Sequence, residues 1–313
     1  MLGRTAGGLF WMFRYLERSE NTARLLDTGF RIALTGSDSA ESEWESIVST
    51  AGVRDQYLEK YDTFDQAHVT NFLLRDKDNP SSVMSVIDAA RSNARMVRTA
   101  LSSEVWEATN ETWMTMKDAL SRQVSVKNLA DVLAGVRQHS SLVRGALHGT
   151  MLRNEIFDFA RIGTFVERAD NTARILDVKY YVLLPSAAFV GSSMDNAQWE
   201  TILRSVSAFR SYRWLNEAET TPKTIASFLI LDRRMPRSLA FCYSKIVGNL
   251  GYLAQQHVGG LPCLDMAQDI FAKLDNRDIE TVFDQGLHEF LEGSIHDTTR
   301  LAAQIQEDFR FYG

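Results

Sequence analysis

The sequence predicts an all-α fold, a helical bundle built from two tandem pseudo-symmetric repeats. Two observations predict the helices: the 313 residues include only five prolines, and no segment alternates apolar and polar residues between turn signals. A third observation, a motif that occurs twice, predicts the repeats. Apolar residues make up 45% and charged residues 24%, so a chain of this length can bury a core without disulfides or metals.

The repeated motif spans fourteen residues. Residues 14–27 (RYLERSENTARLLD) align with residues 164–177 (TFVERADNTARILD), with eight identities at an offset of 150. The match continues at offsets of 155 and 156 with Trp44 and Trp199, Ile47 and Ile202, Phe72 and Phe228, Asp76 and Asp232, Pro80 and Pro236, and Ser82 and Ser238. Blocks in the same order at nearly the same offset predict a tandem duplication. The repeats are expected at about 1–150 and 151–313, inside one helical domain of residues 1–313.

In chain order, the first repeat opens on a long predicted helix over 9–34, which has no proline and one interior glycine. Asp38 and Glu41 have the spacing of a capping box before a second helix. Asn79 followed by Pro80 predicts an N-cap and a first helical residue. Further helices are expected over 63–75, 81–101, 103–121 and 126–148.

The second repeat opens on a predicted helix over 155–184, which Pro185 would end because proline cannot continue a helix. Asp195 and Gln198 have the spacing of a second capping box, at the place that matches the first. Two more helices are expected over 236–256 and 277–311.

The first repeated helix has two distinct sides on a helical wheel. Apolar and small residues gather on one side and predict a core stripe of Met12, Tyr15, Leu16, Ser19, Thr22, Ala23 and Leu26. The opposite side carries the polar candidate residues Arg14, Glu17, Arg18, Asn21 and Arg24, together with Phe10 and Leu25. The second copy repeats four of these polar residues as Glu167, Arg168, Asn171 and Arg174.

Solvated positions drift freely between duplicated halves, so polar residues kept in both copies indicate a shared role. One role is structural, because Glu and Arg between packed helices can form a buried network that fixes their register. The other is ligand binding, because several guanidinium groups in one cavity could hold a carboxylate or phosphate. The residues alone leave both roles open and assign no catalytic residue.

Net charge and motif content exclude several function classes. The formal charge of −6 is unfavourable for a nucleic-acid partner. The basic run Arg233, Arg234 and Arg237 is expected in a solvated loop. The sequence contains no glycine-rich nucleotide loop, zinc-binding HExxH or GxSxG elbow, so neither a cofactor nor a metal is expected. His288, Glu292 and His296 share one predicted helix face, which is expected to be solvated.

The expected location is the cytoplasm. Cys242 and Cys263 form neither a CxxC pair nor a metal-binding pattern, which favours a reducing compartment. The first residues show no signal-peptide pattern. The most apolar stretch, 180–190, is too short to span a membrane, so no membrane partner is expected.

Residues 10–27 (FWMFRYLERSENTARLLD) resemble the opening of the bacterial alpha-E family, which is named for its helical content and its Glu-Arg motif. Residues 165–174 (FVERADNTAR) look like the second signature of that family. The resemblance covers essentially the whole chain. Thr164 departs from the pattern, because it stands where Arg14 stands in the first copy.

The resemblance implies a genetic and functional context. Alpha-E proteins are typically encoded beside, or fused to, a circularly permuted ATP-grasp ligase, with a transglutaminase-like cysteine peptidase as a frequent neighbour. The expected function is therefore an accessory or scaffold subunit of an ATP-grasp amide ligase that binds an anionic peptide or amino-acid substrate. The alternative is an enzyme that uses Glu17 and Glu167 as acid and base in an Arg-lined cavity. A third option is a helical module that serves only for dimerisation, that is, to form a homo-oligomer.

Overall fold

A computed structural model describes residues 1–33, 40–181, 193–216, 220–255 and 259–312. The described ranges contain helices and connecting turns and no β-strand, so the all-α prediction is confirmed. The predicted end of the second long helix at Pro185 and the residue Asp38 lie outside these ranges. Across the described helices, none combines the length and apolar content that crossing a bilayer requires.

The first half of the chain forms seven α-helices and one short 3₁₀ helix in the described ranges. Their bounds are α1 Gly3–Ala33, α2 Ala40–Thr50, α3 Arg54–Leu58, α4 Gln66–Leu74, α5 Val83–Met96, η1 Arg98–Ala100, α6 Ser103–Ala119 and α7 Val126–Thr150. In the second half the helices are α8 Glu155–Tyr181, α9 Ser193–Ser205, α10 Phe209–Leu215, α11 Pro222–Ile230, α12 Leu239–Ala254, α13 Pro262–Asp275, α14 Ile279–Gln285 and α15 Leu287–Asp308.

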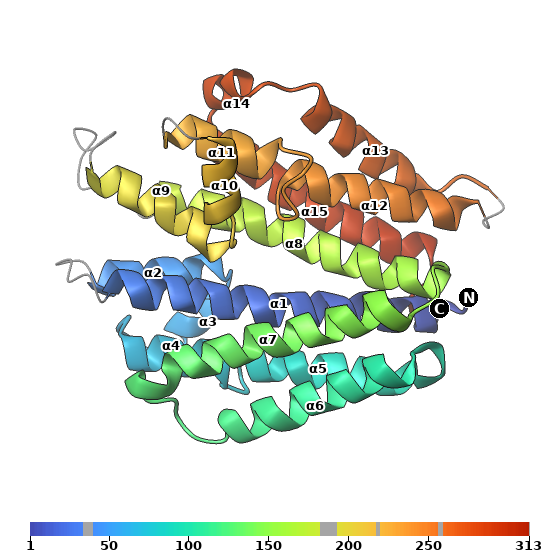
Figure 1. The fold of residues 1–313 in the computed structure, drawn as a ribbon, viewed down its shortest axis with the longest axis horizontal. Helices are drawn as coiled ribbons and strands as arrows, with labels where there is room; N and C mark the ends of the chain where they lie inside the picture. The colour runs from blue at the N-terminus through green and yellow to red at the C-terminus, as the bar shows by residue number, and fades with distance from the viewer. Residues whose placement is uncertain (34–39, 182–192, 217–219, 256–258, 313) are drawn as a thin grey trace.

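The two helices that carry the repeated motif lie side by side at the centre of the molecule (Figure 1). Helix α1 also packs against α5 and α7, which α6 covers, and α8 packs against α12 and α15, which α13 covers. Each half thus contributes a group of four long helices, and α1 and α8 join the two groups. A rotational symmetry between the groups remains a prediction of the sequence.

Helix α1 is buried on both of its sides, which explains its mixed polar and apolar wheel. The predicted core stripe is confirmed at Met12, Leu16 and Ala23, which are almost fully buried. Phe10 on the opposite side is also fully buried, and so is the carboxylate of Glu17. A helix enclosed all round needs partners for its polar side chains, because an unpaired buried charge is strongly unfavourable.

Several predicted helix ends differ from the observed ones. Pro80 precedes α5, whose N-cap is Ser82, and Asn79 instead donates a hydrogen bond from Nδ2 to the carbonyl of Phe72 at 3.0 Å. Ser238 caps α12 in the same way as Ser82 caps α5. These two serines are a pair that the repeat matches. The Asn79–Pro80 prediction is therefore wrong, although the repeat locates the true caps.

Two other predicted boundaries are also wrong. Asp195 lies inside α9, which already begins at Ser193, so it cannot be the N-cap. The helix expected over 277–311 is broken at Gly286, which has φ of 100° between α14 and α15. Glycine reaches this conformation without the steric penalty that a side chain would add.

Candidate functional site

The Glu-Arg pairs of the two motif copies bind each other across the α1–α8 contact. On α1, the carboxylate of Glu17 accepts two hydrogen bonds from Arg168 of α8, from Nε and Nη2, each at 2.9 Å. On α8, Glu167 accepts two from Arg18 of α1, from Nε at 2.6 Å and Nη2 at 3.0 Å. Each glutamate therefore binds the arginine of the other copy, and each pair has the two-pronged geometry that makes Arg–carboxylate contacts strong.

Further guanidinium groups complete the coordination of both carboxylates. Glu17 also contacts Nη1 of Arg237 at 3.0 Å and Nη1 of Arg144 at 3.4 Å. Glu167 also accepts a hydrogen bond from Nε of Arg14 at 2.9 Å. Three arginines thus surround Glu17 and two surround Glu167, and both glutamates are buried, at 1% and 4% exposure.

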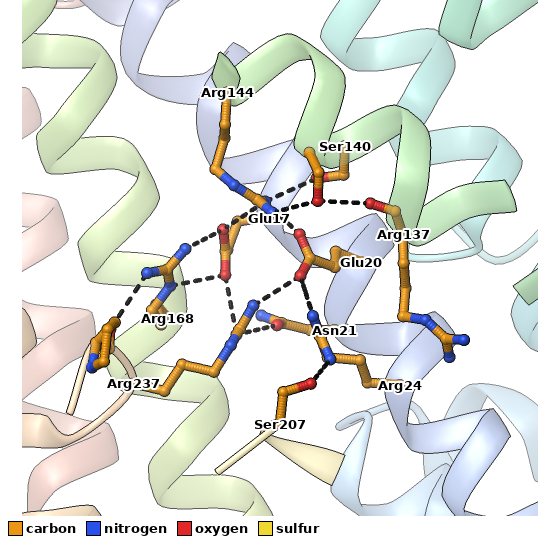
Figure 2. Close-up of polar contacts among 12 residues, drawn as sticks. Glu17, Glu20, Asn21, Arg24, Arg137, Ser140, Arg144, Arg168, Ser207 and Arg237 are labelled. Carbon is orange, nitrogen blue, oxygen red and sulfur yellow. Dashed lines mark hydrogen bonds and ion pairs between the residues drawn. The ribbon is translucent and has the colours of Figure 1, made fainter. Parts of the chain in front are cut away.

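A third buried carboxylate, that of Glu20, lies one turn after Glu17 on α1 and shares partners with it (Figure 2). It contacts Arg144 and accepts a hydrogen bond from Nη2 of Arg237 at 2.8 Å. It also accepts one from Nη2 of Arg24, which lies one turn further on, at 2.6 Å. Arg237 and Arg144 therefore bridge the two glutamates from different sides, one from the start of α12 and the other from α7.

Hydrogen bonds from α8 to two backbone carbonyls position Arg237. Its carbonyl oxygen accepts a hydrogen bond from Thr172 of α8 at 2.8 Å, and the neighbouring carbonyl of Pro236 accepts one from Arg168 at 3.2 Å. The expectation of a solvated basic loop is right for Arg233 and Arg234, whose side chains are 54% and 73% exposed. It is wrong for Arg237, whose side chain is 7% exposed, because this arginine enters the ion network.

The remaining predicted residues occupy different positions around the network. Asn21 accepts a hydrogen bond from Arg237 at 3.1 Å, while its buried amide nitrogen has no protein acceptor among the described residues. Asn171 is also buried, but its neutral amide adds no charge to the network. Arg174 binds Asp170 at 2.7 Å, with the same spacing of four residues that joins Arg24 to Glu20.

The network keeps its glutamates ionised. Burial alone would raise the pKa of Glu17, but Arg168, Arg237 and Arg144 outweigh burial and lower it far below 4.5. Burial opposes ionisation of Glu167 in the same way, yet Arg18 and Arg14 lower its pKa to about 2. The pKa of Glu20 is also lowered, against burial and the neighbouring charge of Glu17. Neither Glu17 nor Glu167 holds a proton to donate near neutral pH.

These shifts predict how stability depends on pH. A carboxyl group whose pKa is lowered by folding stabilises the protein above its unfolded pKa, here about 4.5, and loses that contribution as pH falls toward the folded value. We expect the free energy of unfolding to fall between about pH 4.5 and 2, by about 1.4 kcal/mol per pH unit for each such group. Urea unfolding at a series of pH values measures this dependence.

A matched pair of variants separates these carboxylates from the rest of the chain. Glu167→Gln should make the acid dependence shallower, because one of the groups with a lowered pKa is gone. Glu45→Gln removes the same charge from an exposed pair with Arg54 and should leave the slope nearly unchanged. Equal slopes for wild type and Glu167→Gln would contradict this account of the site.

Positive charge exceeds negative charge in the larger part of the network. Arg24, Arg144, Arg168 and Arg237 surround the two carboxylates of Glu17 and Glu20, a balance of four positive against two negative charges. Burial lowers the pKa of Arg237 to about 10 despite both glutamates, and Arg168 and Arg24 add to the repulsion. The excess favours an anion nearby, because buried like charges are costly unless they are compensated.

A small cavity opens beside this excess of positive charge, between α7 and α8. It has a volume of about 230 Å³ and is lined by Arg144, Gly145, Leu147, His148, Arg161, Thr164, Phe165 and Arg168. The cavity is therefore rich in arginine, as the ligand-binding hypothesis expected, but only Arg168 belongs to the predicted set. Glu17 and Glu167 are not among its lining residues.

A larger groove of about 970 Å³ is lined by residues of α2, α3, α8 and α15. It is lined by hydroxyl groups and by charges of both signs, including Arg174, Asp177 and Glu292. His288 was expected on a solvated face, but its Nδ1 contacts the carboxylate of Asp177 at 2.6 Å. Asp177 ends the second motif copy, and its counterpart Asp27 binds Arg137 of α7 at 3.0 Å.

Comparison with known proteins identifies the family. The model of a family named Alpha-E, described as a predicted alpha-helical domain with a conserved ER motif, matches residues 1–309. The Glu17–Arg18 and Glu167–Arg168 dipeptides are the two ER sequences that exchange partners in the structure. No solved structure matches the chain significantly.

Curated relatives include proteins from Mycobacterium bovis and Mycobacterium tuberculosis, both named only as uncharacterized proteins. Each is 23% identical over 329 aligned positions, which cover 96% of this chain and 36% of the relative. The chain thus spans about a third of the length of the curated relatives that it matches. The larger part of each relative lies outside the matched region.

Proposed function

The chain belongs to the Alpha-E family, and we propose that it is a non-catalytic accessory subunit that docks on an ATP-grasp amide ligase and holds an anionic peptide or amino-acid substrate. The exchange of partners between the two Glu-Arg pairs is the observation that carries the proposal. It ties the two central helices together through ion pairs that use both carboxylates fully. Such a network supports a rigid scaffold better than it supports acid–base chemistry.

The alternative, an enzyme with Glu17 and Glu167 as acid and base, is less favourable on chemical grounds. A general acid or base works best with a pKa near the operating pH and with access to the reacting proton. The pKa of Glu167 is about 2, that of Glu17 is lower still, and both side chains are almost fully buried. Their lone pairs already accept hydrogen bonds from arginine, so neither carboxylate is free to take part in proton transfer.

Two further observations support an accessory role. The buried network carries an excess of positive charge beside an arginine-lined cavity, which suits a ligand with a carboxylate or phosphate group. The relatives extend far beyond the region that this chain matches, as expected when an Alpha-E region works next to another polypeptide. The ATP chemistry would belong to the ligase, and a transglutaminase-like peptidase would act on the same class of amide product.

Affinity purification of the tagged chain from its native cells, followed by mass spectrometry, tests the docking. We expect an ATP-grasp ligase at near-stoichiometric amounts. Recovery of the chain alone under gentle, low-salt conditions would contradict the accessory role.

A second experiment separates the accessory role from catalysis by the chain. Glu167→Gln, assayed at a temperature where the variant is folded, should support the ligase reaction at the wild-type rate. A rate that drops with a changed pH profile, while the variant stays folded and bound to the ligase, would favour the enzyme alternative instead.

A further inference from the structure

We propose that the cavity between α7 and α8 is an oxyanion-binding site in which Arg161 is the principal ligand-binding residue. The inference deepens the proposed function and rests on it for the class of ligand, a small molecule or peptide end that carries a carboxylate or phosphate group. Arg161 belongs to neither the repeated polar set nor the ion network described above. It lies on α8 two turns before Arg168, and both side chains line the cavity.

Arg161 lacks the carboxylate partner that the other two cavity arginines have. Arg144 and Arg168 both bind Glu17, whereas no carboxylate of the described residues lies within ion-pairing distance of the Arg161 guanidinium. Its contact to Nε2 of His148, at 3.0 Å, is the one hydrogen bond that the described part of the chain provides. Because a guanidinium has five N–H donors, most of them remain available to a ligand.

The rings of two phenylalanines hold the Arg161 guanidinium at the cavity. The ring centroid of Phe165 lies 4.5 Å from its Cζ atom, and that of Phe157 lies 5.7 Å away. Stacking on aromatic faces restricts a long side chain without using its N–H groups. Arg161 is therefore positioned in advance, and its planar edge is free to bind an oxyanion through two parallel hydrogen bonds.

The electrostatic environment of the cavity is positive. Burial, together with the charges of Arg168 and Arg153, lowers the pKa of Arg161 to about 10, against the opposing effect of the acidic neighbour Asp158. Burial also lowers the pKa of His148, with Arg161 and Arg153 as the next causes. His148 is then neutral near pH 7 and can accept the hydrogen bond from Arg161. A bound anion would offset the positive charge that lowers these two pKa values, so the cavity favours an anionic ligand.

The size of the cavity restricts the ligand. A volume of about 230 Å³ accommodates a carboxylate or phosphate group with a short organic chain, and it is far too small for a folded partner. Leu147 and Phe165 contribute an apolar wall, while the hydroxyl of Thr164 adds a polar group. The expected ligand is therefore a small oxyanion with an apolar or amide-bearing substituent.

Binding of inorganic phosphate, acetate and glutamate to the full chain tests the site by calorimetry and thermal unfolding, with sodium chloride at equal ionic strength as the control. Arg161→Gln removes the proposed ligand-binding charge and leaves the Glu-Arg exchange intact. Arg98→Gln is the matched control, because Arg98 also stacks on an aromatic ring, that of Trp106, and lies at the surface. We expect the dissociation constant of the bound anion to rise about tenfold or more in Arg161→Gln and to stay unchanged in Arg98→Gln.

An NMR titration locates the anion independently. The bound anion should raise the pKa of His148, whose resonance is assigned with His148→Gln, because a negative charge stabilises the imidazolium. Preference for phosphate over acetate and glutamate would identify a phosphoryl ligand, and the reverse would identify a carboxylate. The site is overturned if none of the three anions binds, or if Arg161→Gln binds them as tightly as wild type.

The oxyanion site and the docking of the chain on the ligase can be overturned separately. Under the proposed function, Arg161→Gln still co-purifies with the ligase, because the cavity is a substrate site and not the docking surface. Retained co-purification without any anion binding overturns the oxyanion site alone. Anion binding by a chain that co-purifies with no ligase overturns the accessory role alone.

Discussion

We expect Glu17→Gln to lower the free energy of unfolding by about 3–5 kcal/mol, the range found when one partner of a buried ion pair is removed. Glutamine keeps the shape of the side chain and removes its charge. Arg168, Arg237 and Arg144 then lose the carboxylate that they share, and Glu20 is left to compensate four arginines. Urea denaturation followed by circular dichroism at pH 7 gives the change as a shift of the midpoint.

The control for this variant is an exposed carboxylate that also accepts two hydrogen bonds from one arginine. Glu45 accepts two hydrogen bonds from Arg54, at 3.0 and 2.7 Å, but the side chains are 39% and 46% exposed. Glu45→Gln should change stability by less than about 1 kcal/mol, because surface ion pairs contribute little in water. A similar small effect at Glu17 would show that the network does not stabilise the fold as inferred.

We expect Gly163→Ala to destabilise the protein by about 3 kcal/mol, because overpacking at a rigid contact forces helices apart. Gly163 lies on α8 where it crosses α1, and a Cβ atom there would lie 2.2 Å from the carbonyl oxygen of Phe10. Backbone atoms cannot move aside as a flexible side chain can. The added methyl group would therefore separate the two helices whose approach allows the Glu-Arg exchange.

Gly248→Ala serves as the control for the glycine variant. Gly248 lies in the interior of α12, and a Cβ atom there would meet nothing within 4 Å. Since alanine is the better helix former, this variant should gain up to about 1 kcal/mol. Thermal unfolding of both variants checks the opposite signs, and a stable Gly163→Ala would contradict the close α1–α8 approach.

Most of the long helices could be predicted from the sequence because their signals are local. The scarcity of proline and the local helix signals predict the positions of α5 to α8 and α12 to within about five residues. The starts of two others are less accurate, because α1 begins at Gly3 rather than at residue 9 and α15 begins at Leu287 rather than at residue 277. The segment of α13 was not predicted as a helix. The short helices α3 and α10 were also missed, because tertiary packing rather than a strong local pattern specifies them.

The candidate site was predicted mainly where the repeat marks it, with Arg14 added from the polar side of the first helix. Glu17, Arg18, Glu167 and Arg168 recur in both copies, and the network does form around them. Glu20 was left out, although its counterpart Asp170 is also acidic and binds the matching arginine, Arg174. The conservative change from Glu to Asp hid a partner that the alignment already contained.

The other network residues come from single copies, so the repeat carries no signal for them. Arg237 follows Pro236, which the repeat matches with Pro80, but Ser81 occupies the place that corresponds to Arg237 in the first copy. Arg144 lies on α7, which carries no copy of the motif, and Arg161, a cavity residue outside the network, lies on α8 before the second copy begins. Their importance follows from the fold, which brings α7 and the start of α12 against the central pair.

A double-mutant cycle between Glu167 and Arg18 tests the central claim most directly, namely that the two motif copies are coupled through their Glu-Arg pairs. The side chain of Arg18 is 28% exposed, so its guanidinium reaches solvent when Glu167 is replaced. Both single variants to glutamine are therefore expected to fold. Unfolding of the wild type, the two single variants and the double variant in urea gives the coupling free energy. The account predicts a coupling of about 2 kcal/mol, whereas additive effects within about 0.5 kcal/mol would contradict it.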